Sequence, residues 1–226
     1  MRAEGEARVR LALRGLDPGA RILDIGGGTG AHSRLMRSDG FSPVVVDPSA
    51  AQRARAAALD LPVVGGIGEA LPFADGSFAM AYFHLSLHYG DWRAALSETV
   101  RILRPGGRLW IWTFSRKYLE SSFTGKWFPS VGLHDLARFP EIAEVVAHLT
   151  ASGVASIETG TVIELVERSV ASWEEVFRAR FVSTLQLIDE DELETGIQRF
   201  RGEHPQPEEM ITSPLEFASI CGVVGD

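Results

Sequence analysis

The chain has 226 residues, of which 45% are hydrophobic and 23% charged, so it can build one α/β domain with a substantial core and is not disordered. Its formal net charge of −8 argues against a general nucleic-acid or anionic-membrane surface. The single cysteine, Cys221, excludes an internal disulfide and a cysteine-rich zinc site. No apolar run approaches the ~20 residues of a membrane span, and residues 1–10 lack the apolar centre of a secretory signal. We therefore expect a cytoplasmic protein.

The first part of the chain alternates helical and strand patterns. Residues 1–16 predict one short amphipathic helix, with Val9, Leu11 and Leu13 facing inwards, which Asp17-Pro18-Gly19 ends. Residues 21–25 (RILDI) are typical of a buried strand, and GGGTG follows at once. A helix over 31–37 and a second strand over 41–46 come next.

The glycine-rich turn after the first strand has glycine at positions 26, 28 and 30. Glycine accepts positive φ and has no Cβ, so a ligand can approach the backbone of such a turn closely. The helix behind it directs free N–H groups and a positive dipole end at the same place. Asp24, at the end of the strand, can accept hydrogen bonds from a cationic amine or a hydroxyl. The loop alone is not specific, because dinucleotide and phosphate sites use glycines for related reasons.

The next segment continues the alternation. Ser49 and Gln52 form an S-x-x-Q capping box that predicts a helix over 50–59. Short strands follow over 63–64 and 78–85, then a helix over 92–103 that Arg104-Pro105-Gly106-Gly107 ends. The fifth strand, 109–114, is apolar on both faces, as in a sheet covered on both sides. This alternation predicts a doubly wound parallel sheet.

The second half of the chain is less regular. Residues 115–138 are rich in aromatic side chains, a helix is predicted over 140–149, and residues 157–166 alternate like a strand. Ser172 and Glu175 form a second capping box, which predicts a helix of about fifteen residues. A further helix over 190–201 and a last strand over 215–224 complete the chain.

Four segments in combination, LDIGGGTG, VVVDPS, GEALPFADGSF and LRPGGRLWI, resemble the class I S-adenosylmethionine-dependent methyltransferases, in their small-molecule (type 11-like) group. The resemblance covers residues 23–114. It implies a Rossmann-like, doubly wound, seven-stranded and mostly parallel sheet, whose last strand is antiparallel, with helical cap insertions. It also implies a single methyltransferase domain over 1–226. Residues 1–114 would bind S-adenosylmethionine, and residues 115–153 and 168–212 would form the substrate cover.

The resemblance assigns a set of residues to the cofactor S-adenosylmethionine. They are Asp24, Gly26, Gly27, Gly28, Gly30, Asp47, Pro48, Gly68, Glu69, Phe83 and His84. Asp24 and the glycines would line the methionine and ribose portion, and Asp47 would hold the two ribose hydroxyls through charge-assisted hydrogen bonds. Pro48 would pack against the adenine, with Gly68 and Glu69 along its edge.

Two positions depart from the family pattern. Ile67 stands where the family has an aspartate that reaches the adenine amino group, and Ala79 stands where it has an aspartate of structural use. Simpler interpretations of the assigned acids also remain open. Asp47 would then be only the acid of a turn before a helix, and Glu69 a solvated loop carboxylate.

Candidate catalytic residues follow the fourth strand, where parallel sheets place their sites. His84 or Phe83 would present its backbone to the methionyl amine, while His84, His88 and Tyr89 are the candidates for an acid–base role, although a lone histidine is more often a core residue. Methyl transfer from a sulfonium depends chiefly on alignment and exclusion of water, and it needs a base only for a weakly acidic acceptor.

The aromatic segment has an alternative interpretation too. The side chains of residues 118, 127, 128 and 134 would either face the sulfonium or simply pack within the cover.

Three functions compete. The first is methyl transfer by direct in-line displacement to a small, apolar or aromatic molecule, by a monomer or homodimer that binds no metal, nucleic acid or membrane. The second is a binding protein or partner subunit that has lost transfer, which Ile67 and Ala79 motivate. The third is a nicotinamide-dependent oxidoreductase. The acid before the glycines and the missing third-glycine spacing disfavour it.

Overall fold

A computed structural model of the protein describes residues 3–225, so the predictions for residues 1, 2 and 226 lie outside the described residues. The chain divides into two compact units. Unit 1 contains the chain up to Thr113, Pro140–Gly160 and the chain from Ala218, and unit 2 contains Phe114–Phe139 and Thr161–Phe217.

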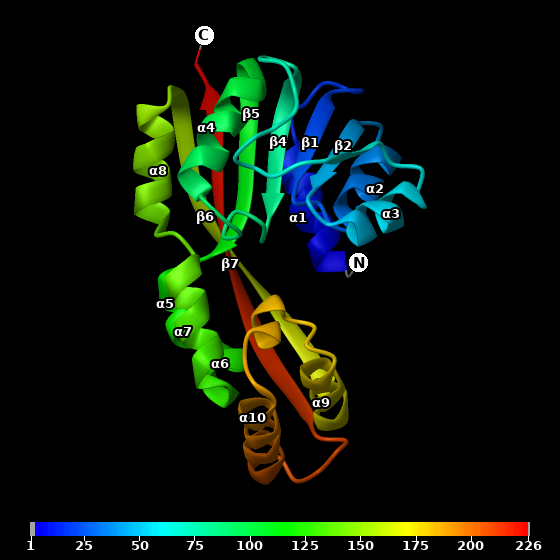
Figure 1. The fold of residues 1–226 in the computed structure, drawn as a ribbon, viewed down its shortest axis with the longest axis vertical. Helices are drawn as coiled ribbons and strands as arrows, with labels where there is room; N and C mark the ends of the chain where they lie inside the picture. The colour runs from blue at the N-terminus through cyan, green and yellow to red at the C-terminus, as the bar shows by residue number, and fades with distance from the viewer. Residues whose placement is uncertain (1–2, 226) are drawn as a thin grey trace. The chain divides into compact units, whose positions relative to one another are not determined.

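The strands form one seven-stranded sheet in the order β3-β2-β1-β4-β5-β7-β6 (Figure 1). Their bounds are β1 Arg21–Ile25, β2 Ser42–Asp47, β3 Val63–Gly65, β4 Phe78–His84, β5 Leu103–Phe114, β6 Val154–Ser169 and β7 Met210–Val224. Strands β1 to β5 pair in parallel. The last strand, β7, lies between β5 and β6 and runs in the opposite direction to β4 (Figure 1). The predicted seven-stranded, mostly parallel sheet is therefore confirmed.

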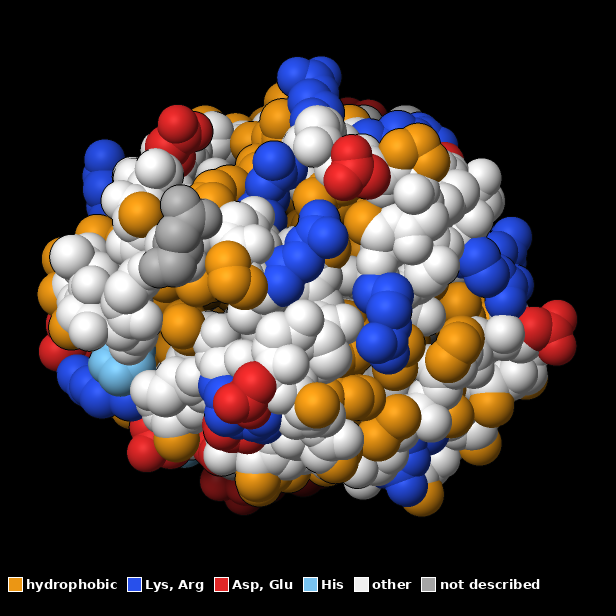
Figure 2. Space-filling view, turned by 90° about the horizontal axis from the view of Figure 1, so that it is seen from above, with side chains coloured by type: hydrophobic (Ala, Val, Ile, Leu, Met, Phe, Trp, Pro, Cys, Tyr) orange, Lys and Arg blue, Asp and Glu red, His pale blue; other side chains and the backbone are white. Residues whose placement is uncertain are grey.

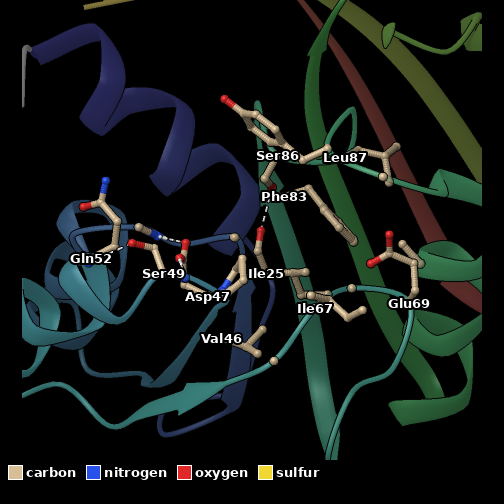
Figure 3. Close-up of a pocket in the computed structure, with 18 of the residues that line it drawn as sticks. Ile25, Val46, Asp47, Ser49, Gln52, Ile67, Glu69, Phe83, Ser86 and Leu87 are labelled. Carbon is tan, nitrogen blue, oxygen red and sulfur yellow. Dashed lines mark hydrogen bonds between the residues drawn. The ribbon is translucent and has the colours of Figure 1, made fainter. Parts of the chain in front are cut away.

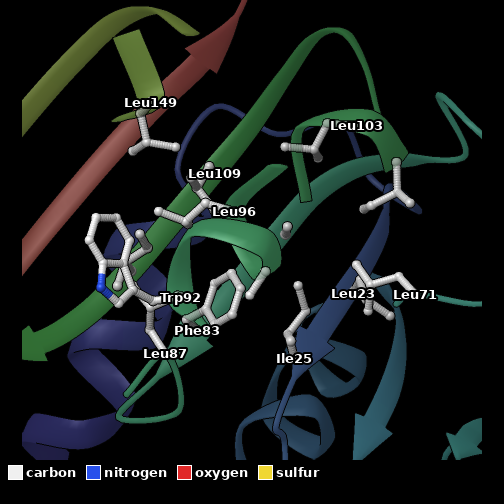
Figure 4. Packing of buried hydrophobic residues seen from close by; sticks show 14 of the residues in the cluster. Leu23, Ile25, Leu71, Phe83, Leu87, Trp92, Leu96, Leu103, Leu109 and Leu149 are labelled. Atoms are coloured by element: carbon white, nitrogen blue, oxygen red, sulfur yellow. The ribbon is translucent and has the colours of Figure 1, made fainter. Parts of the chain in front are cut away.

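The sheet of unit 1 is covered by helices on both faces. These are α1 Ala3–Leu13, α2 Ala31–Ser38, α3 Ala50–Ala57, α4 Trp92–Ile102 and α8 Ile142–Ala151. Apolar side chains of the central strands pack against Trp92 and Leu96 of α4 and Leu149 of α8, which gives the main core (Figure 4). On the other face Val45 packs against Ala56 and the residues near it. Burial on both faces explains why these strands read as continuous apolar runs.

Several strands differ from their predicted bounds, and β5 is the one whose start differs most. β5 begins at Leu103, where the sequence predicted the end of a helix, and Arg104-Pro105-Gly106-Gly107 lies within it. The register against β4 jumps from Phe78–Leu103 to Met80–Arg108, so the intervening residues bulge out of the ladder. Gly106 lies in this segment with φ 69°, in the left-handed region that glycine adopts without strain. The sequence therefore predicted an interruption at Arg104-Pro105-Gly106-Gly107 correctly, but placed it before β5 and not within it.

Unit 2 has a core of its own. Its helices are α5 Arg116–Glu120, α6 Phe123–Trp127, α7 Pro129–Arg138, α9 Val170–Arg178 and α10 Glu190–Glu203, with a 3₁₀ turn at Ser183–Gln186. Trp127 and Phe128 are 1% and 0% exposed, and they pack with Phe177 and Phe200. The packing interpretation of these two aromatic residues is therefore the correct one. His134 is exposed. The role of this part of the chain as a substrate cover stays a prediction.

The first predicted capping box is only partly formed, and the second does not cap a helix. Ser49 Oγ accepts a hydrogen bond from Gln52 N at 3.3 Å, but Ser49 N donates to Asp47 Oδ1 at 2.8 Å rather than to Gln52. The second box is misplaced, because α9 begins at Val170 and Ser169 Oγ caps it by accepting from Ser172 N at 3.2 Å. Ser169, three residues before Ser172, caps the helix instead. The helix also ends earlier than predicted, at Arg178.

Two further observations concern the charge of the surface and the apolar character of the helices. On the face in Figure 2, Lys and Arg side chains alternate with acidic, apolar and uncharged ones. Within residues 3–225, no helix is both long enough and apolar enough to cross a membrane.

Candidate functional site

The turn between β1 and α2 is built from glycines in the left-handed conformation. Gly26, Gly28 and Gly30 have φ of 68°, 55° and 75°, where a side chain is strained. Gly26 N donates to Val46 O at 2.8 Å, which ties the turn to the end of β2. A Cβ added at Gly28 would meet nothing within 4 Å, so the backbone there faces open space. The turn thus exposes main chain for a ligand.

Gly27 and Gly30 are required for packing. A Cβ at Gly27 would lie 2.6 Å from the carboxyl carbon of Asp24, and a Cβ at Gly30 would collide with Leu61 Cδ1. Gly30 lines neither of the pockets described below. Its absence of a side chain lets the start of α2 pack closely against Leu61 and α3.

Asp47, at the end of β2, is only 7% exposed and holds the turn in place. Its Oδ2 accepts from Gly28 N at 3.0 Å, and its Oδ1 accepts from Ser49 N at 2.8 Å (Figure 3). Each carboxylate oxygen has a second lone-pair direction for a further donor. Asp47 therefore supports the glycine turn as well as facing the adjoining pocket.

A pocket of about 450 Å³ lies beside this turn (Figure 3). Of the residues predicted to bind the cofactor, those that line it are Gly26, Gly28, Asp47, Pro48, Gly68, Glu69 and Phe83. Ile25, Val46 and Leu87 add apolar surface. Parallel strands end at this edge of the sheet, which explains why segments far apart in sequence meet here.

Ile67, which replaces the aspartate of the family, and Glu69, two residues later, both line the first pocket. Ile67 lines the pocket and is 48% exposed, so an apolar side chain faces the space where the family has a carboxylate. Glu69 Oε1 accepts from Asp91 N at 2.9 Å, just before α4. Glu69 is thus anchored to the start of that helix and is not a freely solvated loop carboxylate. Ala79 is 7% exposed, within β4.

A second pocket, of about 250 Å³, lies across the glycine turn. It is lined by Asp24, His32, His84, Gln52 and the turn itself, and Gly26, Gly28 and Gln52 line both pockets. Successive strand residues point to opposite faces of a sheet. Phe83 therefore faces the first pocket, whereas His84 joins Asp24 at the second.

Asp24 is buried, with 1% of its surface exposed. Ser33 Oγ donates to its Oδ2 at 2.7 Å. Burial raises the pKa of Asp24 to about 6, and the Ser33 hydrogen bond opposes that rise only partly. The group is poised to hold a cation, because a positive partner would restore the ionised form.

His84 is surrounded by groups that oppose its protonation. Arg8 Nη2 lies 3.2 Å from its Nε2, and the ring of His32 is 4.2 Å away. Burial, then the charges of His32 and Arg8, hold the pKa of His84 well below its usual range. A neutral imidazole whose Nε2 faces an arginine is a poor base. The acid–base role of His84 remains a prediction, and this environment disfavours it.

The other two catalytic candidates differ in access. Tyr89 is 56% exposed and lines the first pocket, while His88 is 6% exposed and lines neither pocket. Their rings lie 4.2 Å apart. Only Tyr89 can reach a molecule bound in the first pocket directly.

Arg8 and His32 are site residues that the sequence reasoning missed. Arg8 is 6% exposed and shares the buried face of α1 with Val9 and Ala12. A charged residue on the apolar face of a predicted helix is the signal that could have revealed it. His32 follows the glycine turn by two positions, which places it at the start of α2 beside the second pocket.

The strand order, the glycine turn after β1 and the carboxylate at the end of β2 define the class I methyltransferase fold. Residues 23–111 match the family described as methyltransferase domain. The resemblance predicted from sequence is therefore confirmed for this segment.

Known proteins agree with this assignment. The demethylmenaquinone methyltransferase of Beutenbergia cavernae is 40% identical over 111 residues, which cover 48% of this chain and 46% of that protein. The chain spans about half the length of the curated relatives it matches. A solved methyltransferase structure from an antibiotic biosynthesis pathway of Anabaena variabilis has a TM-score of 0.75 at 20% identity, with 96% of each chain covered. Phosphoethanolamine N-methyltransferase 2 of Haemonchus contortus, solved with S-adenosyl-L-methionine, has a TM-score of 0.63 at 15% identity, covering 99% of this chain and 53% of that one.

Proposed function

We propose that the protein transfers a methyl group from S-adenosylmethionine to a small, apolar or aromatic molecule by direct in-line displacement. One observation carries the proposal. A single pocket brings together the glycine turn, the Asp47 carboxylate and Gly68, and all of them belong to the segment that matches the methyltransferase-domain family.

The residues of this pocket fit the donor. The backbone of Gly28 faces open space, so a ligand can lie against it. Asp47 retains acceptor capacity for a pair of ribose hydroxyls. Pro48 and Ile67 provide apolar surface for a flat base. When bound, S-adenosylmethionine supplies a methyl group on a positively charged sulfur.

The chain's own contribution is positioning. Aligning the two reactants and excluding water provide most of the acceleration for such a transfer. Of the predicted catalytic residues, Tyr89 is the one that lines the pocket, and its hydroxyl can hydrogen-bond an acceptor there. We assign His84 to holding the second pocket rather than to deprotonation, because Arg8 faces its Nε2.

The name of the relatives suggests which acceptors to test first. Demethylmenaquinone is an apolar aromatic quinone, which agrees with the acceptor class expected from the sequence. The match spans only about half of those relatives, so the acceptor is proposed by class and not by identity.

The test combines binding with product formation. The purified protein is titrated with S-adenosylmethionine and with NAD, then incubated with S-adenosylmethionine and a panel of hydroquinones, phenols and amines while S-adenosylhomocysteine is measured. We expect binding of S-adenosylmethionine alone, and acceptor-dependent product with an aromatic hydroxyl compound. Binding of NAD in its place would contradict the proposal. Binding without transfer to any acceptor would favour a donor-binding protein that does not methylate.

Asp47→Asn provides the matched variant. It keeps one oxygen for the glycine turn but removes the charge, so donor affinity should fall by ~1.5–3 kcal/mol. Asp75→Asn, whose side chain is 81% exposed beside Arg101, is the control and should bind normally. Equal affinity of Asp47→Asn and the wild type would remove Asp47 from the site.

A further inference from the structure

A third pocket, of about 550 Å³, lies among the helices α1, α2 and α3. Its wall includes Glu6 from α1, Arg34 and Leu35 from α2, and Arg55 and Leu59 from α3 and the turn that follows it. A cavity of this size matches those in which proteins bind small molecules. Neither arginine lines the first or the second pocket, so the cofactor assignment leaves this cavity unexplained.

The two arginines of this pocket differ from their neighbours on the same helices. Arg37 of α2 donates to two backbone carbonyls at 2.7 and 2.8 Å, and Arg53 of α3 donates to two others at 2.8 and 2.9 Å. Among residues 3–225, no hydrogen bond or ion pair involves the side chain of Arg34 or Arg55. Both guanidinium groups are therefore available to donate to a molecule in the pocket.

The acid in the pocket wall is already paired. Glu6 Oε2 lies 3.3 Å from Nη1 of Arg10, one turn further along α1. The wall thus has two positive charges that no described carboxylate pairs, in a chain whose formal net charge is −8. The helix α2 also begins at this pocket, at Ala31, and no side chain caps it. The positive end of its dipole adds to the field of the two arginines.

We propose that the third pocket binds a phosphorylated small molecule, whose phosphate group accepts hydrogen bonds from Arg34 and Arg55. A phosphate monoester carries nearly two negative charges near neutral pH, and planar guanidinium groups match its oxygens with paired hydrogen bonds. A carboxylate has a single charge and leaves one of the two arginines unmatched. Leu35 and Leu59 provide apolar surface for the organic part of the molecule.

This site is independent of the proposed methyl transfer. Replacing Arg34 or Arg55 changes no residue that lines the first or second pocket, so binding of S-adenosylhomocysteine should be normal in both variants. The negative charge of the whole chain repels long phosphate polymers, which favours a small molecule as the occupant.

The experiment compares three probes by calorimetry at low salt and about pH 8, well above the second phosphate pKa of ~6. Phenyl phosphate has a dianion and an apolar ring. Inorganic phosphate lacks the ring, and benzoate has the ring with a single negative charge. We expect phenyl phosphate to bind more tightly than either of the other two probes.

Substitutions locate the bound probe. Arg34→Gln and Arg55→Gln should each weaken binding of phenyl phosphate by about 10-fold, as expected for the loss of hydrogen bonds between charged groups. Arg14→Gln is the control, because it removes one positive charge from an exposed position just after α1, outside the pocket. This variant should bind phenyl phosphate as the wild type does.

Equal binding of phenyl phosphate by the wild type and by the Arg34→Gln/Arg55→Gln double variant would overturn the inference, because the compound would then occupy another place. No binding to the wild type at millimolar concentration, or equal affinities for phenyl phosphate and benzoate, would overturn it as well. Both arginines are exposed, so the variants should unfold at the same temperature as the wild type. Should a variant unfold earlier, the comparison of the three probes on the wild type still tests the site.

Discussion

The buried carboxyl group of Asp24 gives the ligand-free protein a pH dependence that one substitution should remove. Burial raises its pKa from 3.8 to about 6. The folded state thus holds this proton more tightly than the unfolded chain does. The stability that the group contributes is complete below pH 3.8 and is lost as the pH rises through 6. At about 1.4 kcal/mol for each pH unit between the two values, the difference comes to ~3 kcal/mol.

Urea unfolding of the wild type and Asp24→Asn between pH 4 and 8 measures this difference. Asparagine keeps an oxygen for the Ser33 hydroxyl, which donates at 2.7 Å in the wild type. The free energy of unfolding of the wild type, relative to the variant, should fall by ~2.5 kcal/mol between pH 4 and 8, because a small part of the full difference is already lost at pH 4.

Ser33→Ala is the control. The Ser33 hydrogen bond lowers the pKa of Asp24, so its removal should move the transition to higher pH and leave its direction unchanged. Parallel stability curves for the wild type and Asp24→Asn would refute the reasoning, because they would mean that Asp24 ionises as readily in the folded protein as in the unfolded chain.

Three further changes test other parts of the structure. Gly30→Ala combines positive φ with a collision and should lower the free energy of unfolding by ~2–4 kcal/mol. Gly19→Ala has the same backbone strain but open space around it, and should lose only ~1–2 kcal/mol. Ser169→Ala should cost ~1 kcal/mol in thermal unfolding through loss of the cap of α9, whereas a larger effect of Ser172→Ala would place the cap where the sequence predicted it. Ile67→Asp should tighten or leave unchanged the binding of S-adenosylmethionine by calorimetry. Loss of binding with the fold intact would make Ile67 an apolar contact that the site needs.

The parallel core was predictable because its signals are local. β1, for example, is an apolar run that ends in glycines, and its observed bounds, Arg21–Ile25, are the predicted ones. β5 was predicted too short because a Pro-Gly-Gly run also marks helix ends, and only pairing with β4 shows it to be a bulge. Local sequence therefore specified the elements better than their ends.

In the site, too, the features carried by short segments were predictable, whereas the contacts between distant residues were not. The glycine turn and Asp47 were recognisable from short segments, but their direct hydrogen bond, from Gly28 N to Asp47 Oδ2, joins residues 19 positions apart. The contact between Arg8 and His84 spans 76 positions and depends on how α1 packs against the sheet. Asp24, the glycines and His84 of the second pocket were predicted to bind the cofactor, but the contact of His84 with Arg8 depends on tertiary packing that no local pattern encodes.

The order of strands has a consequence for synthesis on the ribosome. β5 pairs with β4 on one side and with β7 on the other, yet β7 is made last. All of unit 2 lies earlier in the chain than the residues of β7 that belong to unit 1, from Ala218 onwards. During translation the nascent sheet therefore carries an open edge at β5, a strand with fully buried Leu109 and Ile111 in the finished protein. Unpaired apolar edges bind other strands readily. Chains interrupted before Ala218 should consequently be far more prone to aggregate than chains that reach Val224.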